Sequence, residues 1–283
     1  TSQALPNDQL NKFQSIRLRN SGNDDGVTHL KDLALTKLAI RNGIDLELKY
    51  GKAVQVFVNG EYFGLLNLRT DNDRIALSDV LGVPVNAITT MKMDTPEDDI
   101  DFREGDEQVA QNLIDAIKNQ DGYALHQLVD VDNFIDYLIF EDYVGNMDLP
   151  HNNVRLYSVN GGKFRFLLYD LDWAAMRNRT QRLPKMEYLS DDISKMYQIL
   201  RNHDQGFIDA FETRQAEIYN LLSTDKFNAI VDDLAGKIDR DIPYLIQKWG
   251  APHSTFQWQL NLDQLKQDFH VNDFYNRKLY ELD

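Results

Sequence analysis

The sequence predicts an α+β fold with two lobes, a strand-containing first part and a mainly helical second part. A hairpin signal lies in the first part, where residues 53–58 and 62–68 are rich in β-forming residues. Asn59-Gly60 between them is typical of a type I′ turn. In the second part, apolar residues recur instead at helical spacing. We therefore expect an N-lobe at residues 1–107 and a helical C-lobe at 108–283, which together form a single domain.

The remaining elements of the N-lobe are predicted to be short. Alternating residues indicate a strand, helical spacing indicates helices, and clusters of turn-forming or acidic residues indicate loops. The predicted elements are a strand at 13–19, a loop at 20–26, a helix at 30–43, a helix capped by Asp71 that ends at Leu81, and a solvated acidic loop at 94–107. Residues 1–12 are expected to be a polar lead-in.

The C-lobe is predicted to consist of helices around one hairpin. Asn160-Gly161-Gly162 is a second hairpin signal, and it joins predicted strands at 154–159 and 163–169. Apolar spacing predicts the helices, which lie at 109–117, 131–139, 207–222 and 230–245. A loop at 145–153 therefore stands between a helix and the hairpin.

Composition narrows the classes of function. A chain of 283 residues can bury a large core, and its net charge of −15 argues against a nucleic-acid partner. The same charge would favour a basic partner, although acidity also serves solubility. The chain has no cysteine, which excludes disulfides, zinc–thiolate sites and cysteine nucleophiles. No apolar run is long enough for a membrane span, and we expect no signal peptide in these residues, although a precursor could have carried one.

The loop at 145–153 carries the first chemical motif. Its sequence, Gly-Asn-Met-Asp-Leu-Pro-His-Asn-Asn, places Asp148 five residues before Asn153. Protein kinases use H-R-D-x-x-x-x-N in this context, where the Asp orients the attacking hydroxyl and the Asn holds Mg²⁺. Asn146-Met147 replaces His-Arg here. Asn152 could substitute for Asn153 if the register differs by one residue.

The second motif follows the hairpin. Asp170 and Asp172 come after Phe164-Arg-Phe-Leu-Leu-Tyr, and strand alternation puts both carboxylates on one face. Two carboxylates at a strand end suit a hard divalent cation. Kinases place the Mg²⁺-binding Asp of D-F-G at the corresponding position. Asp170 is therefore the expected metal ligand, and Asp172 is expected to be a second one.

Each motif also has a simpler interpretation. D-x-x-x-x-N often occurs by chance, Asp148-Leu-Pro is an ordinary turn, and Asp170 and Asp172 could be solvated or cap a helix. It is the order, spacing and shared helix–loop–hairpin context of the two motifs that favour a catalytic site. A metal-dependent phosphoesterase that uses Asp170 and Asp172 is a further alternative.

Blocks of residues along nearly the whole chain carry a family resemblance, and the most specific blocks surround Asp148 and Asp170. The full set is Ile16-Arg-Leu-Arg-Asn-Ser21, Val56-Phe-Val-Asn-Gly-Glu-Tyr-Phe-Gly64, Phe134-Ile-Asp-Tyr137, Gly145-Asn-Met-Asp148, Asn153, Tyr157, Lys163-Phe-Arg-Phe166, Asp170-Leu-Asp-Trp173 and Gln247-Lys-Trp249-Gly-Ala-Pro252. Together they resemble the CotH family (spore-coat-protein-H-like proteins), whose members are atypical protein kinases.

This resemblance implies a two-lobed kinase-like fold, ATP and Mg²⁺ as cofactor and metal, and transfer of the γ-phosphate to a protein serine. By position, it implies that Asp148 is catalytic, that Asn153 and Asp170 bind the metal, and that Asp172 assists. The expected partner is a protein substrate, basic or Ser-rich, and the expected state is a monomer. The resemblance also implies an extracellular or cell-surface location.

The nucleotide-binding residues have no clear motif. Neither a G-x-G-x-x-G loop nor a V-A-I-K strand is present. Arg17 and Arg19 share one face of a predicted strand, and guanidinium groups suit phosphate oxygens, so these two residues are the candidates. Solvated or ion-paired arginines are the alternative, and Lys92 is another candidate cation.

One departure from the family pattern lies after the first hairpin. Family members place a Glu there, in a pattern like Leu-x-Glu, whereas this chain has Leu68-Arg69-Thr70 and then Asp71. If that Glu anchors a phosphate-binding cation, the chain is instead a catalytically inactive binding module. The sequence therefore supports two hypotheses, a kinase and a pseudokinase.

Overall fold

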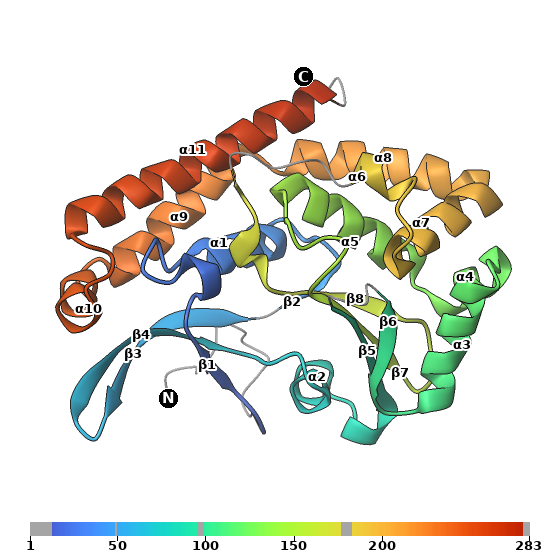
Figure 1. Cartoon of the computed structure of the whole chain (residues 1–283), viewed down its shortest axis with the longest axis horizontal. Coiled ribbons are helices and arrows are strands. Elements are labelled where there is room, and N and C mark those ends of the chain that lie inside the picture. The colour runs from blue at the N-terminus through green and yellow to red at the C-terminus, as the bar shows by residue number, and fades with distance from the viewer. Residues whose placement is uncertain (1–12, 49, 95–98, 177–182, 280–283) are drawn as a thin grey trace.

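The computed structural model describes residues 13–48, 50–94, 99–176 and 183–279, and it confirms the predicted α+β class (Figure 1). The helices are α1 (Lys31–Arg41), α2 (Arg74–Leu81), α3 (Glu107–Lys118), α4 (Gly122–Leu128), α5 (Val131–Val144), α6 (Leu183–Met186), α7 (Asp192–His203), α8 (Gln205–Leu221), α9 (Thr224–Ile238), α10 (Ile242–Trp249) and α11 (Thr255–Leu279). The strands are β1 (Arg17–Arg19), β2 (Glu47–Leu48), β3 (Gly51–Val58), β4 (Glu61–Arg69), β5 (Ile88–Met93), β6 (Ile100–Glu104), β7 (Val154–Val159) and β8 (Arg165–Leu168). Short 3₁₀ turns are η1 (Gly22–Asp24), η2 (Val85–Ala87) and η3 (Leu171–Trp173).

The strands form two sheets. One is antiparallel with the order β1-β4-β3. The other has the order β2-β8-β7-β5-β6, in which β2 runs parallel to β8 and the other neighbours are antiparallel. This second sheet joins strands from both sides of residue 107. The two predicted lobes therefore share one continuous sheet, and the site described below lies where they meet.

Both hairpin turns agree with the sequence prediction. Asn59 and Gly60 have φ values of 52° and 84°, and Asn160 and Gly161 have φ values of 53° and 68°. Two successive residues with positive φ are what a type I′ turn requires, and Asn and Gly adopt that conformation most readily. These turns set the register of β3 with β4 and of β7 with β8.

Three local predictions were wrong. The predicted helix at 230–245 is two helices, since α9 ends at Ile238 and α10 begins at Ile242. The cap of α2 is Asp73 and not Asp71, since the Asp73 carboxylate accepts a hydrogen bond from the Ala76 amide at 2.8 Å. The segment 94–107 is not wholly a loop, because it contains β6, which pairs with β5, and the first residue of α3. Residues 95–98 of that segment lie outside the described residues.

Helix α5 is the centre of the hydrophobic core. Its residues 133–144 are buried, including the polar ones. Phe134 and Tyr137 stack on Phe166 of β8, with ring centroids 4.8 Å and 5.0 Å apart. All faces of α5 are buried and closely packed, so this helix is a rigid support for the loop that follows it.

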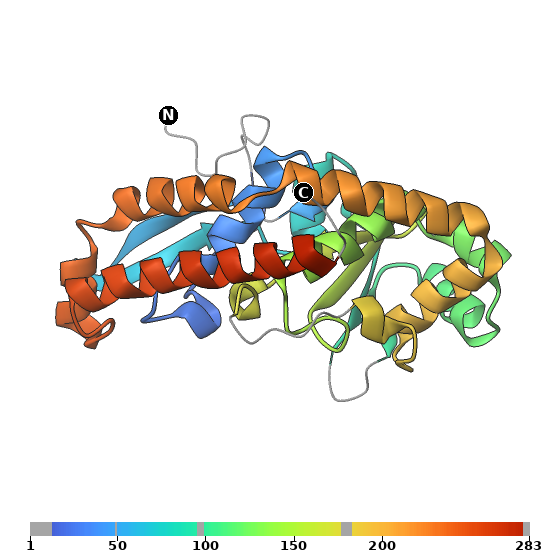
Figure 2. The same cartoon turned by 90° about the horizontal axis from the view of Figure 1, so that it is seen from above.

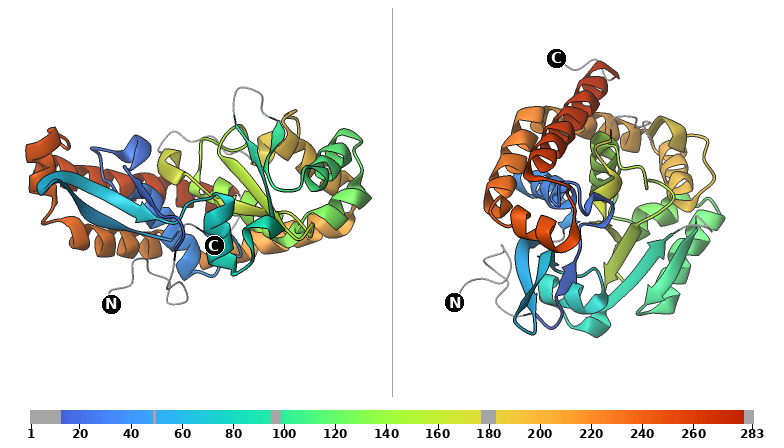
Figure 3. Two further views of the ribbon diagram at one scale, coloured as in Figure 1. Left: turned by 90° about the horizontal axis from the view of Figure 1, so that it is seen from below. Right: turned by 60° about the vertical axis from the view of Figure 1, so that its left-hand side comes forward.

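The long helices α8, α9 and α11 lie on one side of the molecule, and both sheets lie on the other (Figure 1). Figure 2 shows α9 and α11 running alongside each other above α1, with α8 continuing toward the other end. In the right-hand view of Figure 3 the long helices α8, α9 and α11 lie above and both sheets below, whereas α2 lies at the level of the sheets. Among the described residues, no helix has both the length and the apolar character needed to cross a membrane.

Candidate active site

Helix α5 delivers the Asp148 loop to the site. The helix ends because Gly145 adopts the left-handed conformation (φ 65°), and the Asn146 amide then donates to the Glu141 carbonyl at 3.0 Å. Asn146 Oδ1 in turn accepts a hydrogen bond from the Asp148 amide at 3.2 Å. Asp148 is thereby held in a nearly buried position, 7 % exposed.

The Asp148 carboxylate accepts hydrogen bonds from two side-chain amides. Asn152 Nδ2 donates at 3.3 Å and Asn153 Nδ2 at 2.9 Å. Asn153, which has a φ of 60°, points its Nδ2 at Asp148, and its Oδ1 has no hydrogen-bond partner among the described residues. An amide oxygen oriented in this way is available to a hard cation. Both asparagines that the sequence offered as candidates therefore contact Asp148.

The second acidic segment begins where β8 ends. Asp170 adopts the left-handed conformation, with φ 61° and ψ 64°, and η3 follows directly. This conformation is uncommon for a residue with a side chain. It persists only where the surrounding structure imposes it, and such residues cluster at functional sites.

Backbone hydrogen bonds join the two acidic segments. The Met147 amide donates to the Trp173 carbonyl at 3.3 Å, and the Ala175 amide donates to the Val144 carbonyl at 2.8 Å. The Asp148 loop and the Asp170 turn therefore lie side by side, although about twenty positions separate them in sequence. The structure thus brings together the two motifs that the sequence singled out.

Glu141 of α5 lies within electrostatic range of both segments. Its side chain is 1 % exposed. Burial raises the pKa of Glu141 to about 8, against the effect of a hydrogen bond with the Asn146 side chain. The negative charges of Asp148, Asp32 and Asp170 raise this pKa further. The protonation of this one buried carboxyl group therefore depends on the charges of both Asp148 and Asp170.

Arg19 of β1 bridges the two aspartates of the turn. Its Nη2 donates to Asp170 Oδ1 at 2.5 Å and to Asp172 Oδ2 at 3.1 Å. Burial raises the pKa of Asp170 to about 6, while Arg19 acts to lower it. The Asp170 side chain is still 15 % exposed, and its Oδ2 accepts no hydrogen bond from the described residues. That oxygen is therefore open to a ligand.

Asp172 is more tightly enclosed than Asp170. It is 3 % exposed, and the backbone amide and Nδ2 of Asn23 donate to its two oxygens at 3.0 Å and 3.1 Å. Gly22 has a φ of 62°, and a Cβ there would lie 1.7 Å from Asp172 Oδ2. Only glycine therefore fits at position 22, and Asp172 fastens the loop at 20–26 to the turn.

A buried ion pair between Arg69 and Asp32 packs against the Asp170 turn. Arg69 is 2 % exposed, pairs with Asp32 of α1, and donates to Thr36 Oγ1 at 3.3 Å. The Leu171 amide donates to Asp32 Oδ1 at 3.4 Å, which ties η3 to α1. Thr70 follows Arg69 and is also 2 % exposed. The family's expected Glu is therefore replaced by a buried hydroxyl residue.

Sequence reasoning missed three charged residues around the site. Arg69 and Asp32 gave no signal, because their partners are far apart in sequence. Glu141 did give one, since it continues the apolar stripe of Phe134 and Leu138 on α5. An acidic residue at an apolar position of a buried helix indicates a special environment.

Arg17 lies on the same strand as Arg19 but has a different environment. Its side chain is 45 % exposed and pairs with Asp71 at 2.7 Å. It lines a cavity of about 240 Å³ together with Arg103, Arg155 and Tyr169. The Arg155 guanidinium lies over the Tyr169 ring, 5.3 Å from its centroid. Because Tyr169 directly precedes Asp170, this cavity borders the acidic turn.

Lys92, the other candidate cation, is not among the residues that line this cavity. Its Nζ lies 3.1 Å from Asp94 Oδ2, and Asp94 also accepts from Arg155 at 2.8 Å. Arg155 and Lys92 together lower the pKa of Asp94, in opposition to burial. The lysine therefore neutralises a neighbouring carboxylate.

The donor set suits Mg²⁺ that arrives with a nucleotide. Within the described ranges, no group of three or more His, Asp or Glu residues could hold a metal ion. Asp170 and Asn153 do offer one open oxygen each. Mg²⁺ commonly takes one or two protein ligands and completes its shell with phosphate oxygens and water. These residues therefore fit a metal that is shared with a phosphate-bearing substrate.

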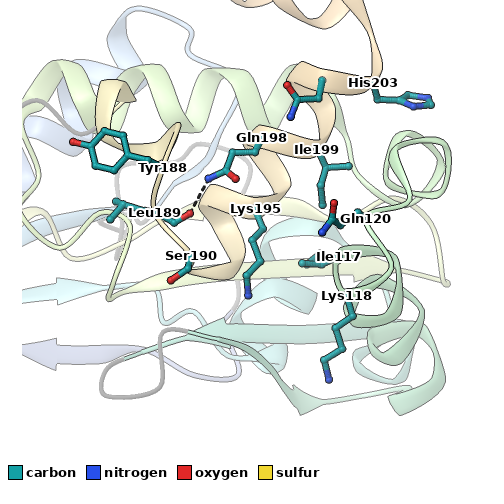
Figure 4. Close-up of a pocket in the computed structure, with 11 residues that line it drawn as sticks. Ile117, Lys118, Gln120, Tyr188, Leu189, Ser190, Lys195, Gln198, Ile199 and His203 are labelled. Carbon is teal, nitrogen blue, oxygen red and sulfur yellow. Dashed lines mark hydrogen bonds between the residues drawn. The ribbon is translucent and has the colours of Figure 1, made fainter.

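A larger cavity lies away from this site, between α3 and α7 (Figure 4). Its volume is about 730 Å³, and none of the residues of the two acidic segments line it. Lys118 and Lys195 extend along it, and Lys195 pairs with Asp192 at 2.8 Å. Among the described residues that line this cavity there is no Asp or Glu.

Comparison with protein families confirms the resemblance. The family model described as "CotH kinase protein" matches residues 2–272. The match covers both acidic segments, both sheets and nearly all of the helices. A comparison with curated proteins finds no match.

Proposed function

The chain belongs to the CotH kinase family, and we propose that it transfers the γ-phosphoryl group of ATP to a serine of an acceptor protein. The observation that carries this proposal is the pairing of the Asp148 loop with the Asp170 turn through two backbone hydrogen bonds. The pairing sets an amide-oriented aspartate beside a part-buried aspartate with an open oxygen. A hydroxyl-orienting Asp and a metal-binding Asp are the pair that kinase chemistry needs.

Asp170 and Asn153 are the proposed ligands of Mg²⁺, and Asp172 is the proposed assisting ligand. When bound, the metal would offset the negative charge that develops on the phosphate oxygens. The chain's own contribution is orientation. Arg19 holds Asp170 in place, and the bond from Asn153 Nδ2 to Asp148 turns the Asn153 oxygen outward.

Asp148 is the proposed catalytic residue. One of its oxygens would accept the hydrogen bond of the acceptor serine, so that the hydroxyl oxygen points at the γ-phosphorus. A bond then forms between that oxygen and phosphorus, the bond to the β-phosphate oxygen breaks, and ADP leaves. The hydroxyl proton passes to Asp148 and then to solvent. Holding the reactants in this geometry supplies most of the catalysis in phosphoryl transfer.

Arg17 and Arg19 are the proposed phosphate contacts. The cavity beside Tyr169, which Arg17 lines, supports the contact of Arg17 with the nucleotide, since Arg103 and Arg155 add two further guanidinium groups to its wall. Arg19 is not among the described residues that line this cavity, and it is proposed from its place beside Asp170. Guanidinium groups bind phosphate oxygens through paired donors. The cavity also contains Asp71, Asp73 and Glu104, so Mg²⁺ would be needed to reduce repulsion between these carboxylates and the triphosphate.

The proposal is tested by transfer of label from γ-labelled ATP to a basic, Ser-rich acceptor or to the protein itself. We expect Mg²⁺-dependent transfer by the wild type and by Asp115→Asn, an exposed control on α3. Transfer should be lost in Asp148→Asn and in Asp170→Asn. Unchanged transfer in both variants would reject the assignment.

A catalytically inactive binding module is the second candidate. The buried Thr70 at the position of the expected Glu favours it, because the chain lacks a carboxylate there. A ligand that binds the folded state raises apparent stability, so a thermal shift with Mg²⁺–ATP separates the cases. A thermal shift without phosphate transfer would indicate a pseudokinase that binds nucleotide. No thermal shift at millimolar ATP would indicate a binding module that does not bind nucleotide. Phosphate release without any acceptor would instead indicate a phosphoesterase.

A further inference from the structure

The centre of α5 contains an acidic residue where packing alone would favour an apolar one. Glu141 is 1 % exposed, and its Oε2 has no hydrogen-bond partner among the described residues. A buried polar atom without a partner is unfavourable by about 1–3 kcal/mol. A leucine at this position would avoid that loss, so the carboxyl group needs another explanation.

The Glu141 side chain makes a hydrogen bond with the Asn146 side chain. Asn146 is 3 % exposed, and its Oδ1 accepts from the Asp148 amide, so its Nδ2 is the donor toward Glu141. The amide group of Asn146 is thus held at both ends, by Glu141 on one side and by the backbone of Asp148 on the other. This chain of contacts reaches the catalytic aspartate from the rigid helix.

We infer that Glu141 is a positioning residue that fixes the backbone of Asp148 through Asn146. This inference rests on the proposed function for its effect on transfer. Without an acceptor at position 141, the buried Nδ2 of Asn146 would have no partner and the side chain would turn. Asp148 would then lose the hydrogen bond to its amide, and its carboxylate would move from the line of attack.

The first test compares Glu141→Leu with Glu141→Gln. Glutamine keeps an oxygen that can accept from Asn146, so we expect its kcat to stay within about threefold of the wild type. Leucine removes the acceptor, and a displacement of about 1 Å lowers kcat by roughly a hundredfold. The KM for ATP should not change in either variant, since Glu141 is not among the residues that line the cavity beside Tyr169. An equal loss in both variants would overturn the inference.

Asp142→Asn is the matched control. Asp142 is the next residue on α5 and is fully buried, but it accepts from the Leu183 amide at 3.2 Å and from Tyr219 Oη at 3.3 Å. Its replacement should lower stability and leave the Asp148 loop in place. A fall in kcat as large as that of Glu141→Leu would show that the loss of any buried carboxyl group in α5 has the same effect, and would overturn the inference.

Amide hydrogen exchange of residues 146–153 tests the positioning claim without any turnover. In nucleotide-free protein, Glu141→Leu should lose protection at the Asp148 amide, whereas Glu141→Gln and Asp142→Asn should keep it. If the wild type transfers no phosphate, the proposed function fails, and this exchange pattern still decides the role of Glu141. Equal protection at Asp148 in all three variants would contradict that role.

Discussion

The two acidic segments of the site hold their carboxylates in opposite ways. Asp148 is bound by neutral amides from its own loop, Asn152 and Asn153, four and five residues away. Asp170 is bound by a cation, Arg19, which is 151 positions away. The first carboxylate is oriented by a local turn, and the second is neutralised by the packing of β1 against the turn. The difference agrees with the proposed roles, which are orientation of the hydroxyl for Asp148 and metal binding for Asp170.

The largest expected effect is that of Asp170→Asn. The metal contributes several kcal/mol to phosphoryl transfer, so its loss should lower the rate by about 10⁴-fold. The thermal shift with Mg²⁺–ATP should disappear in the same variant. Both quantities are measurable on one preparation, by label transfer and by melting. A variant that keeps the thermal shift would show that the metal is held elsewhere.

Asp148→Asn should lower the rate by about 10³-fold, within the range of general-base catalysis. Because Asp148 is not a proposed metal ligand, the Mg²⁺–ATP thermal shift should remain. The same two assays therefore separate the two segments. Equal loss of nucleotide binding in both variants would mean that the segments do not have distinct roles.

Asp172→Asn should affect mainly stability. Its oxygens accept from Arg19 and from Asn23, and an amide nitrogen in their place would face donors. We expect a loss of about 1–3 kcal/mol in the free energy of unfolding, measured with urea. Transfer should persist at reduced rate. If stability is unchanged and transfer falls as far as in Asp170→Asn, Asp172 is a full metal ligand.

The affinity for divalent metal should depend on pH through Asp170. Its pKa is raised to about 6, so the group is protonated below that value and must lose a proton to bind a cation. Affinity should therefore be constant above pH 7 and about tenfold weaker at pH 5. Calorimetry with Mn²⁺ in the absence of nucleotide avoids the titration of ATP. Binding that does not change between pH 5 and 7 would contradict Asp170 as the ligand.

The smallest expected effect is that of Arg17→Ala. The Arg17 side chain is 45 % exposed in its pair with Asp71, so stability should change by less than about 1 kcal/mol. As a proposed phosphate contact, its loss should raise the KM for ATP several-fold, with little change in kcat. Arg19→Ala should raise the KM and, unlike Arg17→Ala, should also lower kcat, because it leaves Asp170 and Asp172 without their shared cation. The same kinetic change in both variants would remove the distinction between the two arginines.

Much of the fold followed from local patterns. The two Asn-Gly turns, α1, α5 and the hairpin of β7 with β8 were predicted, because turn chemistry and apolar spacing act within a few residues. Strand β5 was not predicted. It lies between β6 and β7 in the sheet, and its Thr-Thr-Met-Lys-Met sequence has no clear alternation. Its pairing, and not its pattern, makes it a strand.

The N-cap of α2 is a second feature that local sequence patterns did not predict. Asp71 and Asp73 are both suitable caps by residue type. In the structure Asp73 caps the helix, because the Asp71 carboxylate forms an ion pair with Arg17 of β1. The sequence offers both aspartates equally, and a strand more than fifty residues away decides between them.

The sequence by itself determined the local part of the site, namely the position of Asp148, its spacing from Asn153 and the two acids that follow β8. These features depend on contacts within one segment, whose geometry is limited by the backbone. Only the tertiary structure decided that Arg19 joins Asp170 to Asp172, that Arg69 and Asp32 support the turn, and that Glu141 lies beneath both segments. Those contacts join residues far apart in the chain, and they form only when the whole core packs.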